Sequence, residues 1–193
     1  QRTPYKKIPL DILFILDTTG SMGEELQRLK NTIEIIQLNL TGMTPQPDVR
    51  FGMVLYKDKR DEYRTKRIQF LSDVEEFSKK LSKIEAGGGG DGPEDLQAAL
   101  DDAIHKMQWR DNGLRLGFII TDASPHLDYG QEFTYAHAAQ AAKKKAIKLF
   151  SVGTGGLNIH GEYALRQISQ LTYAKYIFLH YGEESESDGG VQG

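Results

Sequence analysis

The sequence predicts an α/β protein with a doubly wound, Rossmann-like sheet that is mainly parallel and has helices on both faces. Short apolar runs, of the kind found in strands buried on both faces, alternate with longer segments whose apolar residues recur at helical spacing. The 193 residues, 39% of them hydrophobic and 26% charged, suffice for one core of ordinary composition. Right-handed crossovers between parallel strands would bring the loops at their carboxyl ends to one edge of the sheet.

The first half of the chain supplies three predicted strands. Leu10 to Leu16 is an apolar run that we expect as a buried parallel strand, and Glu24 to Leu40 follows as an amphipathic helix ending before the turn Thr44 to Pro47. Arg50 to Tyr56 is a second buried strand. Because Arg64 to Leu71 follows a short polar turn, we expect it to pair antiparallel with that strand at one edge of the sheet.

The second half continues the alternation around a glycine-rich loop. An amphipathic helix from Asp73 to Ile84 precedes this loop. The remaining predicted elements are helix Glu94–Trp109, strand Leu114–Thr121, helix Phe133–Lys145, strand Lys148–Val152, helix Tyr163–Leu171 and strand Lys175–Leu179.

Composition sets the domain organisation and excludes several functions. We expect one domain over residues 1–181 and an acidic, glycine-rich disordered tail or linker over residues 182–193. A net charge of -3 with dispersed basic residues argues against nucleic acid as a partner. The chain contains no cysteine and no apolar stretch near the ~20 residues that span a bilayer, so thiolate sites and membrane insertion by this segment are not expected. The chain starts without Met and reads as a fragment of a larger or processed protein, for which we favour an extracellular or cell-envelope location.

Oxygen-bearing side chains follow the first predicted strand. Asp17, Thr19 and Ser21 lie in the loop at its carboxyl end, where open α/β sheets bind ligands. One carboxylate and two hydroxyls suit a hard divalent cation, with Mg²⁺ favoured and Ca²⁺ or Mn²⁺ as alternatives. The competing interpretation is a turn in which Thr19 and Ser21 cap the next helix.

Two further loops carry carboxylates to the same edge. The glycine-rich loop contains Asp91, which would either bind the cation or cap a helix beginning near Pro93. Asp122 directly follows the strand that ends at Thr121. Asp58, after the second strand, would orient a water or a hydroxyl near the cation, or would be a solvated turn residue. The three loops together predict a metal site.

These loops resemble the metal-ion-dependent adhesion site of the von Willebrand factor A domain family. Its pattern, Asp-x-Ser/Thr-x-Ser after the first strand and Asp after a later one, is matched by Asp17, Thr19, Ser21 and Asp122 over a region from about Pro9 to Leu179. The resemblance implies a non-catalytic domain that binds Mg²⁺ and captures a protein partner, whose acidic side chain completes the metal shell. Most members have Thr where this chain has Asp91, as in a subgroup with a Gly-Gly-Gly-Asp-x-Pro-Glu loop. The added charge puts capture of a partner carboxylate in doubt.

A partner would meet the residues around the cation. We expect these contacts from the loops at that edge, at Thr18, Gly20, Met22, His126 and Asp128. In a second interpretation the metal only steadies the loops of a structural scaffold, and partners bind elsewhere.

An enzyme is the third interpretation. Asp17-Thr18-Thr19-Gly20-Ser21 resembles the Asp-Lys-Thr-Gly-Thr signature of haloacid dehalogenase-like phosphotransferases, in which the first Asp is a phosphorylated nucleophile. Gly90-Asp91-Gly92-Pro93-Glu94-Asp95 imitates that family's magnesium motif. There, however, the motif follows a buried strand, whereas here it follows a helix and a glycine run, so we favour the non-catalytic domain.

Overall fold

A computed structural model describes residues 6–89 and 93–179 of this chain, so Asp91 and the predicted tail from residue 182 lie outside the described residues. Six strands form one sheet in the order β3-β2-β1-β4-β5-β6. All neighbouring pairs are parallel except β2 with β3, which confirms the predicted antiparallel edge strand. The strands are β1 (Pro9–Asp17), β2 (Asp48–Tyr56), β3 (Thr65–Leu71), β4 (Leu114–Thr121), β5 (Ile147–Gly153) and β6 (Tyr176–Phe178).

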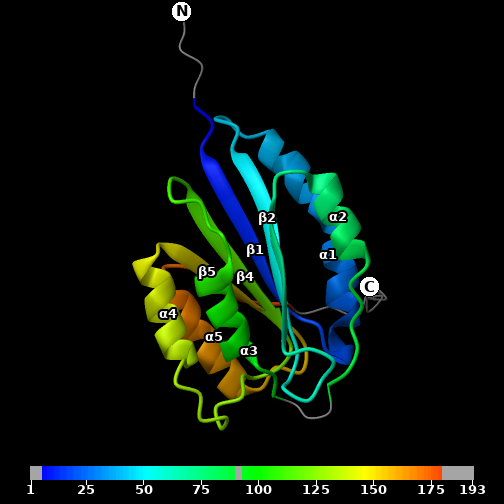
Figure 1. Ribbon diagram of the computed structural model, residues 1–193, viewed down its shortest axis with the longest axis vertical. Coiled ribbons are helices and arrows are strands. Elements are labelled where there is room, and N and C mark those ends of the chain that lie inside the picture. Colours follow the sequence, from blue (N-terminus) through cyan, green and yellow to red (C-terminus); the bar gives the residue numbers. More distant parts are fainter. Residues whose placement is uncertain (1–5, 90–92, 180–193) are drawn as a thin grey trace, which may run out of the picture.

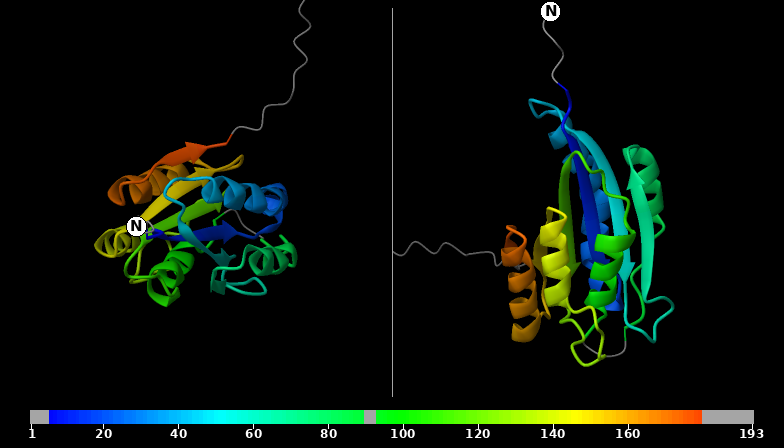
Figure 2. Two further views of the ribbon diagram at one scale, coloured as in Figure 1. Left: turned by 90° about the horizontal axis from the view of Figure 1, so that it is seen from above. Right: turned by 60° about the vertical axis from the view of Figure 1, so that its left-hand side comes forward.

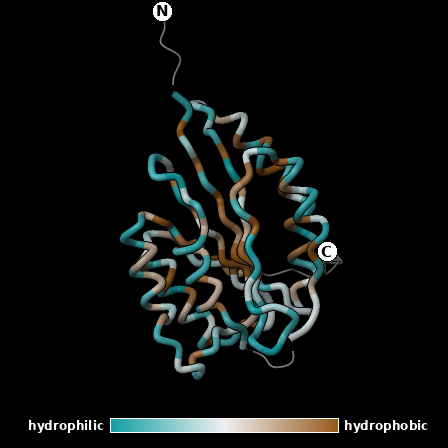
Figure 3. The backbone as a smooth tube through the Cα atoms, viewed as in Figure 1, coloured by the Kyte–Doolittle hydropathy of each residue, from teal (hydrophilic) through white to brown (hydrophobic). Residues whose placement is uncertain are grey.

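Helices cover both faces of the sheet, as the alternating pattern predicts. Helices α1 (Gly23–Thr41) and α2 (Val74–Ser82) pack on one face, and α3 (Leu96–Asp101), α4 (Tyr135–Lys144) and α5 (Ile159–Leu171) pack on the other (Figures 1 and 2). One cluster of buried apolar residues lies between the sheet and each of the two helix layers. The apolar strands form the hydrophobic centre of the molecule in Figure 3, because both of their faces are covered.

The apolar period explains which helical residues are buried. In α1, Leu26, Leu29 and Ile33 are buried, and in α2, Phe77 and Leu81 are buried. The side chain of Asp73 accepts hydrogen bonds from two backbone amides at the start of α2, which fixes that terminus. Beside α1, an apolar groove runs over the sheet face formed by β4 and β5.

The predicted helix Glu94–Trp109 is wrong in both of its limits. Its α-helical part, α3, begins at Leu96 with Asp95 as its cap, so Pro93 does not start it. After Asp101 the chain continues as a wider π-helical segment, η2 (Asp102–Lys106), which ends before Met107. Two side chains donate hydrogen bonds to backbone carbonyl groups of this segment: the Trp109 indole to Ala103 and the Lys145 ammonium to Ile104, at 2.7 Å each. These carbonyl groups therefore have partners without a further turn of helix.

The last predicted helix starts earlier than expected. We predicted Tyr163–Leu171, whereas α5 begins at Ile159, where the Asn158 side chain accepts a hydrogen bond from the Gly161 amide. The first turn of this helix is defined by its Asn cap and not by periodic apolar residues. The apolar pattern alone therefore predicts a start that is too late. Among the described residues no helix is sufficiently long and apolar to span a bilayer.

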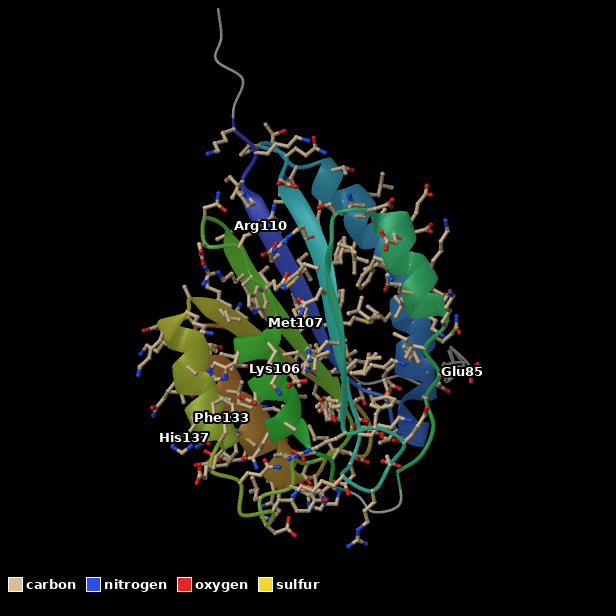
Figure 4. All side chains as sticks on the ribbon, in the orientation of Figure 1. Glu85, Lys106, Met107, Arg110, Phe133 and His137 are labelled. Atoms are coloured by element: carbon tan, nitrogen blue, oxygen red, sulfur yellow. The ribbon has the colours of Figure 1, made fainter. Side chains whose placement is uncertain are left out.

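The amino end of β1 is held by a buried ion pair. Asp11 accepts bidentate hydrogen bonds from the Arg50 guanidinium at 2.9 and 2.8 Å, and it accepts from the backbone amide and the side chain of Arg110 at 2.8 and 2.9 Å. Arg110 lies at one end of the sheet, opposite the loops that follow the carboxyl ends of β1, β2 and β4 (Figure 4). Although burial favours the neutral acid, these hydrogen bonds hold the pKa of Asp11 below its usual value.

Candidate metal centre

The candidate site lies where the order of strands reverses. The chain leaves β1 for β2 on one side, and β4 lies on the other side of β1, so the carboxyl ends of β1 and β4 flank the switch point of this sheet. The loops that follow β1, β2 and β4 meet at this edge, at the lower end of the molecule in Figure 1. The predicted convergence of strand-end loops is therefore what the fold produces.

Asp17 is the centre of this arrangement. Its side chain is fully buried. One carboxylate oxygen accepts hydrogen bonds from the amide of Thr19 at 2.9 Å and from the Thr19 hydroxyl at 2.6 Å. The other oxygen accepts from the Thr121 hydroxyl at 2.9 Å. All three donors are neutral, and among residues 6–89 and 93–179 no Lys, Arg or His side chain forms an ion pair with this carboxylate.

Strand register explains the neighbours of Asp17. Asp17 pairs with Tyr56 on β2, and Leu16 pairs with Ile120 on β4, so the next residue, Thr121, lies on its other side. Both neighbours are fully buried. Neither Tyr56 nor Thr121 is among the ligands predicted from the sequence. Their signal was their position, because each is the last residue of a predicted strand beside the strand that ends at Asp17.

The environment of Asp17 disfavours its charge. Burial raises the pKa of this carboxyl to about 6, and the nearby charge of Asp122 raises it too, while the hydrogen bonds from Thr19 and Thr121 lower it. At pH 7 the carboxylate is therefore mainly ionised, but in a setting that lacks a compensating positive charge.

Thr19 and Ser21 do not serve as helix caps. Thr19 precedes the short helix η1 (Gly20–Met22) and Met22 precedes α1, and neither end has a side-chain cap. The Thr19 hydroxyl donates to Asp17 instead, which overturns the capping interpretation. Ser21 is exposed at the rim of the site. The Thr19 hydroxyl is thus held at the carboxylate, and neither hydroxyl caps the start of a helix.

Asp122 directly follows Thr121, the last residue of β4. Its carboxylate approaches Gly156, where a Cβ would stand 4.0 Å from Oδ2 and 3.5 Å from the Asp122 carbonyl oxygen. Gly156 has a φ of 101°, a conformation that side chains other than glycine rarely adopt. The loop after β5 therefore borders the site beside Asp122. The predicted contribution of Asp91 stays a prediction, because that residue lies outside the described part of the chain.

The glycine-rich loop is tied closely to the loop after β1. Gly87 donates from its amide to the Thr18 carbonyl at 3.0 Å, and Gly20 donates to the Gly88 carbonyl at 3.1 Å. The buried Lys57 donates from Nζ to the Gly87 carbonyl at 2.6 Å. Gly88 has a φ of 79°, and a Cβ there would stand 2.5 Å from the Asp61 carboxylate. Only glycine allows this close approach.

Glu94 fastens the same loop to the loop after β4. Its amide donates to the Ser124 carbonyl and its carbonyl accepts from the His126 amide, at 3.0 Å each. Its side chain is buried, with 3% of its surface exposed, and it is not among the ligands predicted from the sequence. Asp95, rather than Asp91, caps α3, since its side chain accepts from the Ala98 amide.

Asp58 belongs to a neighbouring cluster instead of a solvated turn. It is buried, accepts a hydrogen bond from the Tyr129 hydroxyl and lies 3.6 Å from His126 Nε2. The His126 and Tyr129 rings stack with centroids 4.0 Å apart. Burial alone would raise the pKa of Asp58, but the Tyr129 hydrogen bond and the His126 charge hold it below its usual value. This cluster joins the turn after β2 to the loop after β4.

Some of the expected partner contacts are wrong. Thr18 and Met22 are fully buried: the Thr18 hydroxyl donates to the Tyr56 carbonyl at 3.1 Å, and Met22 packs in the apolar core. His126 is also buried within the cluster of Asp58 and Tyr129. Gly20 and Asp128 are exposed, as expected of residues that meet a partner. The loop after β1 folds tightly onto β2, which buries Thr18, and no local sequence pattern reports this packing.

The site can offer a cation a mixed set of oxygen atoms. Within the described residues, no group of three or more Asp, Glu, His or Cys side chains already stands close enough to hold a metal ion. The residues at the switch point combine the carboxylates of Asp17 and Asp122 with the hydroxyls of Thr19 and Ser21. This donor set fits a hard cation that retains part of its water shell.

Comparisons with known proteins agree with this fold. The family model described as von Willebrand factor type A domain matches residues 11–181. The alpha-protein kinase vwkA of Dictyostelium discoideum is 33% identical over 162 residues, which make up 83% of this chain and 25% of that protein. The von Willebrand factor A domain-containing protein 7 of Rattus norvegicus is 37% identical over 113 residues, 58% of this chain and 12% of that protein. The chain thus spans a quarter or less of these curated relatives.

Solved structures share the architecture at low sequence identity. BatB from Bacteroides thetaiotaomicron has a TM-score of 0.62 at 16% identity, with 90% of this chain and 91% of that chain covered. Proximal thread matrix protein 1 from the mussel byssus has a TM-score of 0.69 at 16% identity, with 89% of this chain and 42% of that chain covered. The latter structure is described as having a zinc-occupied MIDAS motif.

Proposed function

Because this chain belongs to the von Willebrand factor type A domain family, we propose that it is a non-catalytic, metal-dependent protein-interaction domain. The cation would be bound by Asp17, Thr19, Ser21 and Asp122, together with Asp91 as predicted from the sequence. The observation that carries the proposal is Asp17 itself. It is a fully buried carboxylate whose described partners are neutral donors, next to two hydroxyl residues and a second carboxylate.

A bound cation would supply the positive charge that Asp17 lacks. Unpaired buried charge is costly in proteins, and carboxylates in such positions are found with ion-pair partners or metal ions. Mg²⁺ is the cation we favour, because every proposed ligand is a hard oxygen donor. Ca²⁺ and Mn²⁺ share this preference and belong in the same test, as does the Zn²⁺ held by the similar mussel protein.

Calorimetric titration of each cation into metal-stripped protein tests the site. We expect Mg²⁺ to bind the wild-type chain, and we expect binding to be lost in Asp17→Asn. Asp111→Asn is the matched control, because Asp111 is exposed and lies before β4, at the opposite end of that strand from the site. Failure of all four cations to bind the wild-type chain would sink the metal proposal.

We place the protein-binding surface on the exposed rim of the site. Gly20, Ser21, Leu127 and Asp128 are exposed there, and Leu127 has 60% of its surface accessible. The cation would already face the carboxylates of Asp17, Asp122 and the predicted Asp91, so little positive charge would remain for an acidic side chain of a partner. Contact with the rim is therefore a better-supported mode of binding than capture of a carboxylate.

Recovery of partners from the source organism, with and without chelator, separates the interaction function from a scaffold role. We expect chelator and Leu127→Ser each to reduce recovery. Recovery unchanged by chelator would instead favour a domain whose metal only steadies its loops.

The phosphotransferase alternative has its own test. In an assay with a generic phosphatase substrate and Mg²⁺, turnover abolished by Asp17→Asn would favour the phosphotransferase.

We also propose an extracellular or cell-envelope location for this protein. Fractionation of the source cells tests the location.

A further inference from the structure

Lys57 is a buried cation that is not among the predicted ligands. It directly follows β2 and has 4% of its surface exposed, and its Nζ donates a 2.6 Å hydrogen bond to the Gly87 carbonyl. Within the described residues its amino group forms no ion pair with a carboxylate. Lysine is rarely buried without such a partner, because burial of its charge is costly. This side chain therefore holds the glycine-rich loop instead of balancing an acid.

Tyr63 extends this contact to the loop after β1. Its ring centroid lies 4.9 Å from Nζ of Lys57, and its hydroxyl lies 2.7 Å from the Thr18 hydroxyl. The Thr18 carbonyl in turn accepts from the Gly87 amide at 3.0 Å. These four residues form a closed ring of contacts that joins the turn after β2, the loop after β1 and the glycine-rich loop.

The same turn also holds the next part of the glycine-rich loop. The Asp61 carboxylate accepts a hydrogen bond from the Gly89 amide at 3.0 Å, and Gly20 of the loop after β1 donates to the Gly88 carbonyl at 3.1 Å. Each glycine from 87 to 89 is thus bound by a neighbouring segment. These contacts end two residues before Asp91, the ligand predicted from the sequence.

We propose that Lys57 is a positioning residue of the cation site, which holds the glycine-rich loop against the loop after β1 before the cation binds. This inference rests on the proposed cation site, to which the loop after β1 brings Thr19 and Ser21 and the glycine-rich loop brings the predicted Asp91. When the two loops are already in place, the cation does not have to order them, and less of its binding free energy is lost.

The direction of the effect separates positioning from charge. A positive charge near the site repels Mg²⁺, so if Lys57 acted through its charge alone, its removal would tighten binding. Lys57→Met removes both the charge and the hydrogen bond while it keeps an unbranched side chain. We expect the Mg²⁺ affinity of the folded variant, measured by calorimetry, to fall about tenfold or more, the range found when groups that support metal ligands are lost. Unchanged or tighter binding would overturn the proposal.

Lys30 offers a matched control. Its Nζ donates to the Ile84 carbonyl at 2.6 Å, on the connection from α2 to the glycine-rich loop where Glu85 is labelled in Figure 4. Lys30→Met therefore loses the same kind of hydrogen bond three residues before Gly87, but no contact between the two loops. We expect it to bind Mg²⁺ like wild type. An equal fall in both variants would contradict the proposal, because loosening of the connection would then be the cause.

Amide hydrogen exchange in metal-free protein shows whether the change is local. Gly20 and Gly87 donate the hydrogen bonds between the two loops, so their amides should exchange faster in Lys57→Met than in wild type. The acceleration should be smaller at Phe14, in the centre of β1. Loss of Mg²⁺ affinity with equal acceleration at all three amides, or with none, would show that Lys57 does not act by positioning the loops.

A measurement on the unaltered protein covers the case in which Lys57→Met does not fold. In metal-free wild type the amides of Gly20 and Gly87 should already exchange far more slowly than unstructured amides, and Mg²⁺ should change their rates little. Amides that become protected only when Mg²⁺ binds would overturn the inference, since the cation would then bring the loops together. If no cation binds the wild-type chain, the proposed function itself fails, whatever the exchange rates.

Discussion

Two buried aspartates on β1 show how one strand serves two purposes. Asp11 and Asp17 lie six residues apart and so face the same side of the sheet. Asp11 lies beside Arg50 on β2 and Arg115 on β4, whereas Asp17 lies beside Tyr56 and Thr121. The first carboxylate has its countercharge built into the chain, and its pKa is lowered; the second has neutral donors, and its pKa is raised to about 6.

The difference separates an anchor from the proposed binding site. Asp11 fixes the amino ends of the strands through Arg50 and Arg110, and it needs nothing from solution. Two other buried carboxylates follow the same rule: Asp95 pairs with Arg64 at 2.5 Å, and Asp102 pairs with Arg67 at 2.6 Å. The described surroundings of Asp17 depart from this rule at the switch point, where the fold collects oxygen ligands.

The largest expected effect comes from breaking the anchor. Asp11→Asn would leave two guanidinium groups without their shared countercharge, and it should lower the unfolding free energy by about 3 kcal/mol or more. Asp17→Asn should leave the metal-free protein as stable as wild type or more so, because it removes an uncompensated charge. Chemical denaturation in chelator measures both, and equal destabilisation by the two variants would contradict the comparison.

The next largest effect is the contribution of Asp17 to the pH dependence of the unfolding free energy. Because its pKa is raised in the folded state, the folded protein binds more protons between pH about 4 and 6, and the Asp17 contribution to stability is lost as pH rises through that window. The shift corresponds to about 3 kcal/mol, taken as roughly two pKa units. Denaturation in chelator at a series of pH values, for wild type and Asp17→Asn, isolates this contribution as a difference. A difference that is flat from pH 4 to 7 would contradict the raised pKa.

The hydroxyl of Thr121 supports the charged form of Asp17, and its removal should cost less. Thr121→Val deletes the 2.9 Å hydrogen bond while it keeps the shape of the side chain. A hydrogen bond to a charged group contributes about 1.5–3 kcal/mol, so we expect a loss near the lower end at pH 7, with a smaller loss at pH 4. Denaturation at these two pH values checks the ordering. A larger loss at pH 4 would show that Thr121 does not act through the Asp17 charge.

Tyr56→Phe should have the smallest effect on stability. The hydroxyl makes no hydrogen bond to the described residues, so its removal should change the metal-free unfolding free energy by less than about 0.5 kcal/mol. Mg²⁺ affinity should nevertheless fall, because the hydroxyl belongs to the side chain that lies beside Asp17 at the candidate site. Calorimetry and denaturation on the same sample make the test, and a variant with wild-type affinity would remove Tyr56 from the site.

The sequence allowed most of the fold to be predicted because its apolar periods are clear. The strand Leu114–Thr121 has the predicted limits, β1 is one residue longer at each end, and β2 and β3 differ from prediction only at their first residue, by two residues and one residue. The predicted helix from Glu94 was too long because side chains bind the carbonyl groups near its end: Trp109, six residues after Ala103, and Lys145, from a distant segment. No local pattern reports such contacts.

The candidate site was predicted in part. Asp17, Thr19 and Asp122 come together at the switch point, which follows from their positions after β1 and β4. Tyr56 and Thr121 were within reach of sequence reasoning, since strand ends in a parallel sheet lie side by side. Glu94 was not, because its approach to Thr19 depends on how the glycine-rich loop folds between two others.

The most direct test of the central claim is the melting temperature of the wild-type chain with saturating Mg²⁺ and with chelator, alongside Asp17→Asn. If a cation supplies to Asp17 what Arg50 and Arg110 supply to Asp11, Mg²⁺ should raise the wild-type melting temperature, because a ligand that binds the folded state stabilises it. The same addition should leave Asp17→Asn unchanged. A wild-type melting temperature that Mg²⁺ does not change, or an equal rise in the variant, would contradict the account.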